Sequence, residues 1–149
     1  PDMAHFKFTR AILKGEKIDV YNHGEMSRDF TYIDDLVNAM RLLIDKVPKK
    51  ERTPNETNDE PNSESKVAPF RLINIGNSNP TKLLDFIIAI EKSTGMNAVK
   101  NFMPMQAGDM SATWADISRL EKLTGYRPKT DLKDGVEKFV SWYCEYYVP

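Results

Sequence analysis

The sequence has 149 residues, 40% hydrophobic and 29% charged, which is typical of one ordinary globular domain. Its 21 basic and 22 acidic residues leave a formal net charge of -1, so the basic excess of nucleic-acid-binding proteins is absent. One cysteine and two histidines provide neither an internal disulfide nor a zinc-binding spacing. The longest apolar run, residues 86–90, is far shorter than the roughly 20 residues that span a bilayer. We expect a cytoplasmic protein without nucleic-acid or membrane partners and without a structural metal.

The first elements are a helix and a short strand. Apolar residues recur at spacings of three and four over residues 3–13, which predicts a helix, and Gly15 is its expected stop. Residues 18–21 then alternate between apolar and polar side chains and lead into Asn22-His23-Gly24. This pattern predicts a short half-buried strand that ends in a turn.

A second short strand is predicted at residues 28–32, followed by a helix that begins at Asp34 or Asp35 and ends before Pro48. Acidic residues suit the amino end of a helix, so we interpret both aspartates as capping groups. An acid/base pair is the alternative interpretation. Adjacent residues on a helix point in different directions, which favours capping.

A polar insert follows this helix. Residues 49–66 contain no aromatic or aliphatic side chain and are rich in Glu, Asn, Pro, Ser and Thr. Such a segment cannot bury enough apolar surface to offset its ordering entropy. We therefore expect a flexible polar loop; a partner-binding tail is the alternative, although long polar insertions are usually just tolerated.

The next segment predicts a strand followed by a helix. Continuous apolarity over residues 70–75 predicts a strand buried on both faces of a parallel sheet. Ser78 or Asn79 is the expected cap of the following helix, with Pro80 in its first turn and Gly95 at its end.

The remaining elements are a strand and two helices. Residues 98–105 predict a strand, residues 117–124 a short helix closed by Gly125, and residues 131–147 a last helix. Strands and helices alternate along the whole chain, which indicates the α/β class.

The sequence alone provides no catalytic constellation. Residues 74–78 follow a predicted strand and precede a predicted helix, where backbone amides can bind phosphate. They contain one glycine instead of the three spaced glycines of a dinucleotide fingerprint, which favours a simple turn. Cys144 has no histidine close to it in sequence, so it is a poor candidate for a nucleophile.

Residues 21–35 carry more information. Tyr21 and Arg28 lie seven residues apart across a glycine-containing turn, an arrangement that could stack a nucleotide base and clamp a phosphate. A hairpin with a surface arginine is the alternative interpretation.

Five sequence blocks, in order, together resemble the carboxyl-terminal half of UDP-glucuronate 4-epimerases, members of the extended short-chain dehydrogenase/reductase family. The blocks are residues 1–4 (PDMA), 21–35 (YNHGEMSRDFTYIDD), 74–78 (NIGNS), 104–109 (PMQAGD) and 135–143 (GVEKFVSWY). They span essentially the whole chain. The resemblance implies that residues 1–149 are an α/β, UDP-sugar-binding carboxyl-terminal portion. It includes a strand and a helix that would complete a Rossmann domain otherwise absent from this sequence.

The resemblance also implies what the chain lacks. In the family, an amino-terminal Rossmann domain holds NAD and supplies the tyrosine and lysine of a YxxxK motif. No tyrosine of this sequence has a lysine four positions later. We therefore expect no catalytic and no cofactor-binding residues here, and a chain that is inactive by itself.

The resemblance implies a nucleotide site. Tyr21 matches the aromatic residue that stacks on the uracil, Arg28 the arginine that binds the diphosphate, and Asp109 the carboxylate that accepts a ribose hydroxyl. Gln106 stands where related galactose epimerases carry an arginine, and a neutral amide cannot replace that charge. Met3 falls near the helix that lines the base pocket.

Trp114 departs from the smaller residues that the family places in its segment. It either narrows a local contact or is a surface variation.

The intact enzyme implied by the resemblance oxidises the sugar at C4 with bound NAD, rotates the ketone intermediate and returns the hydride to the other face. This chain would supply substrate binding and orientation. The alternatives are a stand-alone binding or regulatory module, a purely structural α/β domain, and a portion of a related nucleotide-sugar dehydratase or epimerase.

Family members are commonly homodimers. Because the strand at residues 70–75 and the helix at residues 34–46 would pack on the Rossmann sheet, we expect the chain alone to expose apolar surface and to self-associate or rearrange.

Overall fold

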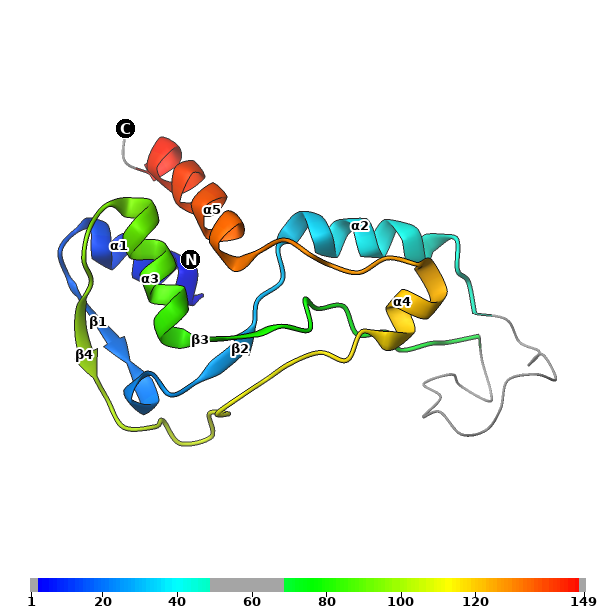
Figure 1. The fold of residues 1–149 in the computed structure, drawn as a ribbon, viewed down its shortest axis with the longest axis horizontal. Helices are drawn as coiled ribbons and strands as arrows, with labels where there is room; N and C mark the ends of the chain where they lie inside the picture. Colours follow the sequence, from blue (N-terminus) through cyan, green and yellow to red (C-terminus); the bar gives the residue numbers. More distant parts are fainter. Residues whose placement is uncertain (1–2, 49–68, 148–149) are drawn as a thin grey trace.

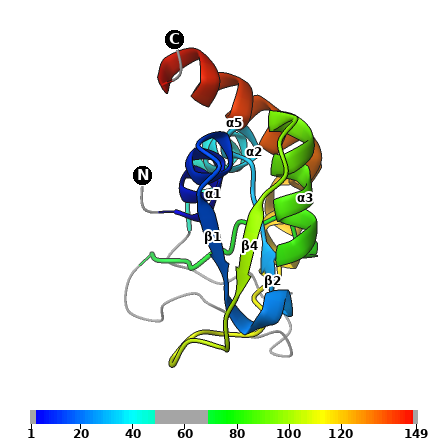
Figure 2. The same ribbon diagram turned by 90° about the vertical axis from the view of Figure 1, so that its left-hand side faces the viewer.

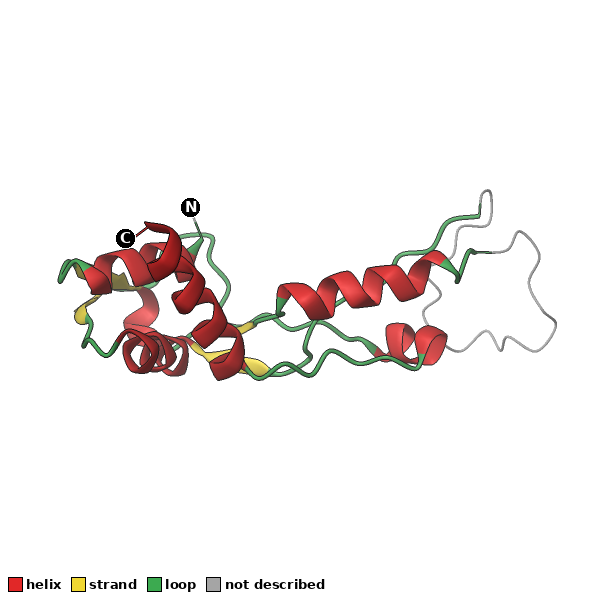
Figure 3. Ribbon diagram, turned by 90° about the horizontal axis from the view of Figure 1, so that it is seen from above, coloured by secondary structure: helices red, strands yellow, loops and turns green. Residues whose placement is uncertain are grey.

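A computed structural model describes residues 3–48 and 69–147, which form two groups of helices joined by extended segments (Figure 1). The larger group contains α1 (Ala4–Leu13), β1 (Lys17–Val20), α3 (Leu83–Thr94), β4 (Val99–Phe102) and α5 (Leu132–Tyr147). The smaller group contains α2 (Ile33–Ile44) and α4 (Ser118–Thr124), and β2 (Ser27–Asp29) and β3 (Pro80–Lys82) lie between the two groups. A short 3-10 helix, η1 (Tyr21–Gly24), links β1 to β2. Seen from above, the molecule is elongated (Figure 3). The polar loop predicted at residues 49–66 lies outside the described residues.

The strands form two small sheets. β1 and β4 lie side by side and pair in parallel, with Lys17 opposite Val99 and Val20 opposite Phe102 (Figure 2). β2 and β3 pair in antiparallel fashion. Along β1 the residues alternate between exposed and buried, so the predicted half-buried strand is confirmed. The second strand, predicted at residues 28–32, is present as β2 but ends at Asp29, and the mixed α/β content is confirmed.

The main hydrophobic core lies in the larger group, where α3 packs against both α1 and α5. Ile12 from α1, Val20 from β1 and Ile90 from α3 have at most 1% of their surface exposed. Phe30, just after β2, stacks on Phe86 of α3 with ring centroids 4.5 Å apart. Burial of these side chains is the principal stabilising force of this half of the molecule.

The smaller group has a much smaller core. Ala39, Ile117 and Leu120 are its buried residues, and they join α2 to α4. On another face of α2, an apolar stripe remains in contact with solvent, with side chains 54–71% exposed; its members are Ile33, Val37, Met40 and Ile44. Their spacing of three and four residues places them along one side of the helix.

Glycine ends two of the helices as the sequence predicts. Gly95 follows α3 with φ of 68° and Gly125 follows α4 with φ of 67°, both in the left-handed region. A side chain at either position would be strained in this conformation.

The prediction of a buried strand at residues 70–75 is wrong. Only Arg71 takes part in a β-bridge, and Phe70 and Leu72 are 58% and 63% exposed. A strand buried on both faces requires neighbouring strands and covering helices. The two sheets of the described residues do not include this segment, so Phe70 and Leu72 stay exposed, while Ile73 and Ile75 pack against the small core between α2 and α4.

The predicted start of α3 is also wrong. Ser78 and Asn79 do not cap the helix; Lys82 is the N-cap residue, and Pro80 belongs to β3 instead of the first helical turn. Pairing of β3 with β2 keeps Pro80 opposite Asp29 in extended conformation, and the helix begins only where this pairing ends.

Asp35 does not cap its own helix, contrary to the prediction; the N-cap residue of α2 is Tyr32. The Asp35 carboxylate accepts hydrogen bonds from Tyr126 Oη (2.7 Å), the Thr130 amide (2.8 Å) and the Lys129 amide (3.2 Å). Burial alone would raise the pKa of Asp35, but these hydrogen bonds outweigh it and lower the pKa below its usual value. Asp35 therefore attaches α2 to the segment that precedes α5.

These bonds predict an acid-sensitive contribution to stability. A lowered pKa in the folded state means that Asp35 stabilises the fold above its ordinary pKa of about 4 and loses this effect as the pH falls through the folded value. We expect Asp35→Asn to cost about 2 kcal/mol at neutral pH. Thermal unfolding measured from about pH 6 down to about pH 2 should then show a flatter pH dependence for the variant than for the unmodified chain.

Asp34 offers a matched control, since it is the neighbouring aspartate and its side chain is exposed. Asp34→Asn should preserve the acid-dependent loss of stability. Identical pH profiles for Asp35→Asn and the unmodified chain would contradict this role of Asp35.

Candidate functional site

Arg28 and Asp109, two of the residues selected from the sequence, are in direct contact. Arg28 Nη2 lies 2.7 Å from Asp109 Oδ1, and Arg28 Nη1 donates to the Ser27 carbonyl at 2.9 Å. The same Asp109 oxygen accepts the Met110 amide at 2.9 Å. Both charged side chains are about a third exposed, 30% and 35%, so the pair adds little stability. The ion pair does hold the positively charged guanidinium group of Arg28 in a defined position at the surface.

Backbone hydrogen bonds place the segment after β4 beside β1, η1 and β2. The Met103 amide donates to the Val20 carbonyl and the His23 amide to the Met103 carbonyl, both at 3.0 Å. Farther along, the Ser27 amide donates to the Ser111 carbonyl at 2.9 Å. The loop between residues 103 and 111 therefore begins beside η1 and ends beside β2.

This arrangement gathers most of the sequence-selected residues at one edge. Tyr21 directly follows β1, and Gln106 and Asp109 lie in the loop after β4, so all three are at the carboxyl ends of two parallel strands. Such ends are the usual ligand-binding edge of parallel sheets. The Gln106 carbonyl accepts the Asp109 amide at 3.2 Å, which places the exposed Gln106 beside the ion pair.

Met3 is placed differently. It is the N-cap residue of α1, and its side chain is 67% exposed. α1 precedes β1 and ends at the amino end of that strand, whereas the other selected residues follow the carboxyl ends. The contacts described here join Met3 to α1 through its carbonyl and not to the ion pair.

Asp29, the neighbour of Arg28, organises the site and was not selected from the sequence. Its carboxylate accepts the backbone amides of Ser78 at 2.9 Å, Ala115 at 3.1 Å and Asn77 at 3.2 Å. The amides at residues 77 and 78 thus bind an internal carboxylate, which agrees with the interpretation of residues 74–78 as a turn and not a phosphate site. The one sequence feature that could have indicated this role of Asp29 is the presence of an acidic residue within a short predicted strand.

Gly76 allows this carboxylate to approach. A Cβ at this position would lie 2.5 Å from the Ala115 Cβ and 2.8 Å from Asp29 Oδ2, closer than such atoms approach in folded proteins. Gly76 itself is buried, and the Asp29 carboxylate could move away from an added methyl group only by weakening its three amide hydrogen bonds.

We expect Gly76→Ala to lower the free energy of unfolding by about 1–3 kcal/mol because the added methyl group overpacks this contact. Denaturant unfolding at neutral pH provides the measurement. Gly135→Ala is a suitable control, because its Cβ would meet only the Tyr32 ring, at 3.2 Å, and alanine favours a helix. A Gly76→Ala chain as stable as the control would show that the Asp29 contact tolerates a side chain.

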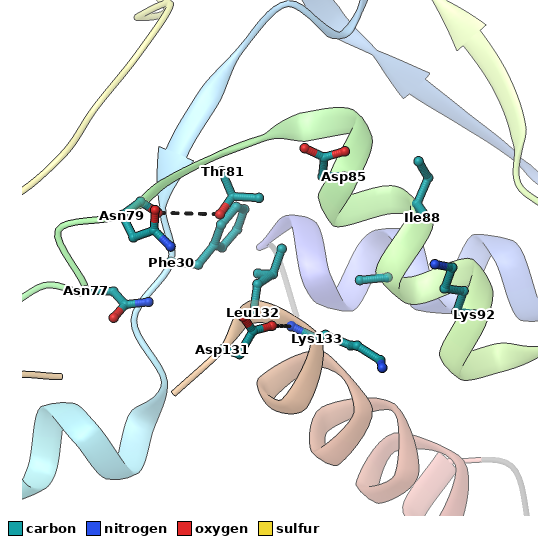
Figure 4. Close-up of a pocket in the computed structure, with 11 residues that line it drawn as sticks. Phe30, Asn77, Asn79, Thr81, Asp85, Ile88, Lys92, Asp131, Leu132 and Lys133 are labelled. Carbon is teal, nitrogen blue, oxygen red and sulfur yellow. Dashed lines mark hydrogen bonds between the residues drawn. The ribbon is translucent and has the colours of Figure 1, made fainter. Parts of the chain in front are cut away.

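Two cavities that adjoin Phe30 lie away from the ion pair. One of about 310 Å³ is lined by polar side chains, among them Asn77, Asn79 and Asp131, around Phe30 (Figure 4). The other, of about 410 Å³, is mainly apolar and lies between Phe30, Phe86 and Phe139. None of the five residues selected from the sequence lines either of these two cavities.

Two further expectations concern metal and membrane. Among residues 3–48 and 69–147, no group of histidine, cysteine and acidic side chains could hold a metal ion. None of the helices in these ranges is long and apolar enough to cross a membrane.

Comparison with known proteins identifies the family. Residues 4–139 match the family model described as GDP-mannose 4,6 dehydratase. The chain belongs to the GDP-mannose 4,6 dehydratase family. The match covers all the described helices and strands except the end of α5.

Among curated proteins, the chain is 47% identical over 149 residues to Protein CapI of Staphylococcus aureus. It is 44% identical over 149 residues to the probable UDP-glucuronate 4-epimerase of Rhizobium meliloti (strain 1021). Each alignment covers 99% of this chain but 43% of the relative. The chain thus spans less than half the length of the curated relatives that it matches.

Solved structures agree with this relationship. The UDP-glucuronic acid 4-epimerase of Bacillus cereus in complex with UDP-glucuronic acid and NAD superimposes with a TM-score of 0.76 at 30% identity. The match covers 99% of this chain and 41% of that protein. The resemblance to UDP-glucuronate 4-epimerases and the α/β fold of the extended short-chain dehydrogenase/reductase family are therefore confirmed.

Proposed function

We propose that this chain is the nucleotide-sugar-binding portion of an NAD-dependent UDP-glucuronate 4-epimerase. The main support for this proposal is the ion pair between Arg28 and Asp109. The guanidinium nitrogen Nη2 lies 2.7 Å from the carboxylate oxygen Oδ1, and the pair is at the carboxyl ends of β1 and β4. An arginine suits phosphate oxygens and a carboxylate suits a sugar hydroxyl. Similarity to UDP-glucuronate 4-epimerases supports assigning both groups to one UDP-sugar.

Each site residue has a separate role in this proposal. Tyr21 stacks on the uracil, a contact worth about 1 kcal/mol beyond its buried area. Arg28 binds the diphosphate, Asp109 accepts a ribose hydroxyl, and the neutral Gln106 contributes amide hydrogen bonds instead of a second positive charge. Met3 is assigned to the base pocket by the resemblance alone, since no contact described above joins it to the ion pair.

Arg28 retains hydrogen-bonding capacity for a phosphate group. A guanidinium group has five N–H donors. Asp109 and the Ser27 carbonyl each engage one of them. The remaining donors and the positive charge are available to diphosphate oxygens, while Asp109 keeps a second carboxylate oxygen for a hydroxyl.

NAD does not fit the residues described here. The turn at residues 74–78 follows an extended segment but has one glycine, and the Asp29 carboxylate already binds its amides at residues 77 and 78. In the intact enzyme, NAD supplies the hydride chemistry and binds mainly to an amino-terminal Rossmann domain that these 149 residues do not include. The chain alone is therefore inactive and binds UDP weakly, because half of the pocket is not preorganised.

A stand-alone binding module is the competing function. The absence of a YxxxK motif from the 149 residues favours it. An upstream reading frame that encodes a glycine-rich strand-helix start and a YxxxK motif would exclude it.

Arg28→Ala tests the proposal. We expect the unmodified chain to bind UDP at millimolar concentration and the variant to bind about tenfold more weakly, because a charge-assisted phosphate contact is lost. Chemical-shift titration with UDP gives both affinities.

Arg127→Ala is the matched control, since Arg127 is 57% exposed and pairs only loosely with Glu121 at 4.0 Å. It should bind UDP like the unmodified chain. Equal weakening by both variants, or unchanged binding by Arg28→Ala, would contradict a diphosphate site at Arg28.

Self-association of the chain is the second part of the proposal, and the apolar stripe of α2 supports it. Its four side chains are more than half exposed, and Phe70 and Leu72 add further apolar surface. Contiguous patches of this kind are typical of surfaces that bind another protein or another domain. In the intact enzyme, which we propose to be a homodimer, the Rossmann domain covers the stripe; in the chain alone, a second copy does.

Light scattering tests this part of the proposal. The unmodified chain should show a concentration-dependent mass above 17.1 kDa. A double variant, Val37→Lys with Met40→Lys, should remain monomeric because charges on the stripe oppose its burial. Met110→Lys, at a residue that is 62% exposed outside the stripe, is the control. A compact, stable monomer of the unmodified chain would contradict the proposal.

A further inference from the structure

The turn between Tyr21 and Arg28 has an uncommon backbone conformation. Asn22, His23 and Gly24 have φ values of 48°, 51° and 85°, so three consecutive residues lie in the left-handed region. Glycine adopts this region freely, but asparagine and histidine do so at a cost in conformational free energy. Such strain persists only where surrounding contacts impose it.

Specific contacts hold this left-handed turn. The His23 amide donates to the Met103 carbonyl at 3.0 Å, and the Asn22 side-chain amide donates to the Glu25 carbonyl at 3.0 Å. The Glu25 amide closes the turn on the Asn22 carbonyl at 2.8 Å. A Cβ at Gly24 would lie 2.7 Å from Leu84 Cγ, so the turn also fits closely against α3.

The turn connects the two halves of the proposed site. Tyr21 directly precedes it, and the chain then continues into β2, which carries Arg28. Through the His23–Met103 bond, the turn also holds the start of the loop that carries Asp109. A relaxed, right-handed turn would redirect the chain between β1 and β2 and change the position of Tyr21 relative to Arg28.

The His23 side chain itself is exposed to solvent. Its contribution to the turn is therefore through the backbone, by its φ angle and its amide hydrogen bond. We infer that Asn22 and His23 are positioning residues that use a left-handed backbone to set the geometry between the Tyr21 ring and the Arg28–Asp109 pair. This inference rests on the proposed UDP-sugar site.

Three substitutions of His23 in the full 149-residue chain distinguish the effect of its backbone conformation from the effect of its imidazole side chain. Glycine and asparagine tolerate a positive φ, whereas the β-branched valine strongly disfavours it. We expect His23→Gly and His23→Asn to keep UDP affinity within about twofold and His23→Val to lose about tenfold, as one strained residue can cost. Chemical-shift titration with UDP measures this. Loss of affinity in all three variants would overturn the inference and assign the role to the imidazole; an unchanged His23→Val affinity would also overturn it.

A second experiment, without UDP, tests the positioning role of His23 separately from the proposed binding of UDP. In the absence of UDP, His23→Val should shift the amide signals of Tyr21, Arg28 and Asp109, while those of α4 stay fixed and show that the fold persists. His23→Gly and His23→Asn should leave the three signals near their original positions. Absence of any UDP effect on the unmodified chain would overturn the proposed function. Unmoved signals in His23→Val would overturn the positioning role by themselves.

Discussion

The Asp29 carboxylate accepts three backbone amides, two from residues 77 and 78 and one from Ala115, and so joins β2 to two segments far along the chain. The extended region between the two groups of helices has few buried apolar side chains, so polar bonds must set its geometry. A carboxylate that receives several amide hydrogen bonds is a strong and directional link. Gly76 is required beside it because a side chain would fill the same space.

The proposed binding site depends on this link. Arg28 precedes Asp29 in β2, and the segment that carries Asp109 runs on to Ala115, which the Asp29 carboxylate holds. The left-handed turn at residues 22–24 fixes the other end of β2 against β4 through Met103. The backbone attachments on either side therefore bring Arg28 and Asp109 together, and the partly exposed ion pair adds little stability of its own.

Local patterns in the sequence predict the helices and the carboxyl-terminal ends of two of them well. Apolar spacing identifies α1, α2, α4 and α5, and glycine marks the ends of α3 and α4, because these signals act within a few residues. Features that depend on distant partners were missed. Residues 70–75 have the composition of a buried strand without a sheet to join, Asp35 binds Tyr126 instead of its own helix, and Asp29 binds amides about 50 and 86 residues away. For the site, Tyr21 and Arg28 followed from spacing and resemblance, whereas the contact of Arg28 with Asp109 spans 81 residues and required the structure.

We propose that the edge formed by Tyr21, Arg28 and Asp109 binds the nucleotide of a UDP-sugar. Intermolecular nuclear Overhauser effects between UDP and the isotope-labelled chain can locate the bound nucleotide. We expect contacts from the uracil H5 and H6 protons to the Tyr21 ring and from the ribose protons to residues near Asp109. Contacts of UDP with the polar cavity around Phe30 and Asn77, and none with Tyr21, would contradict it.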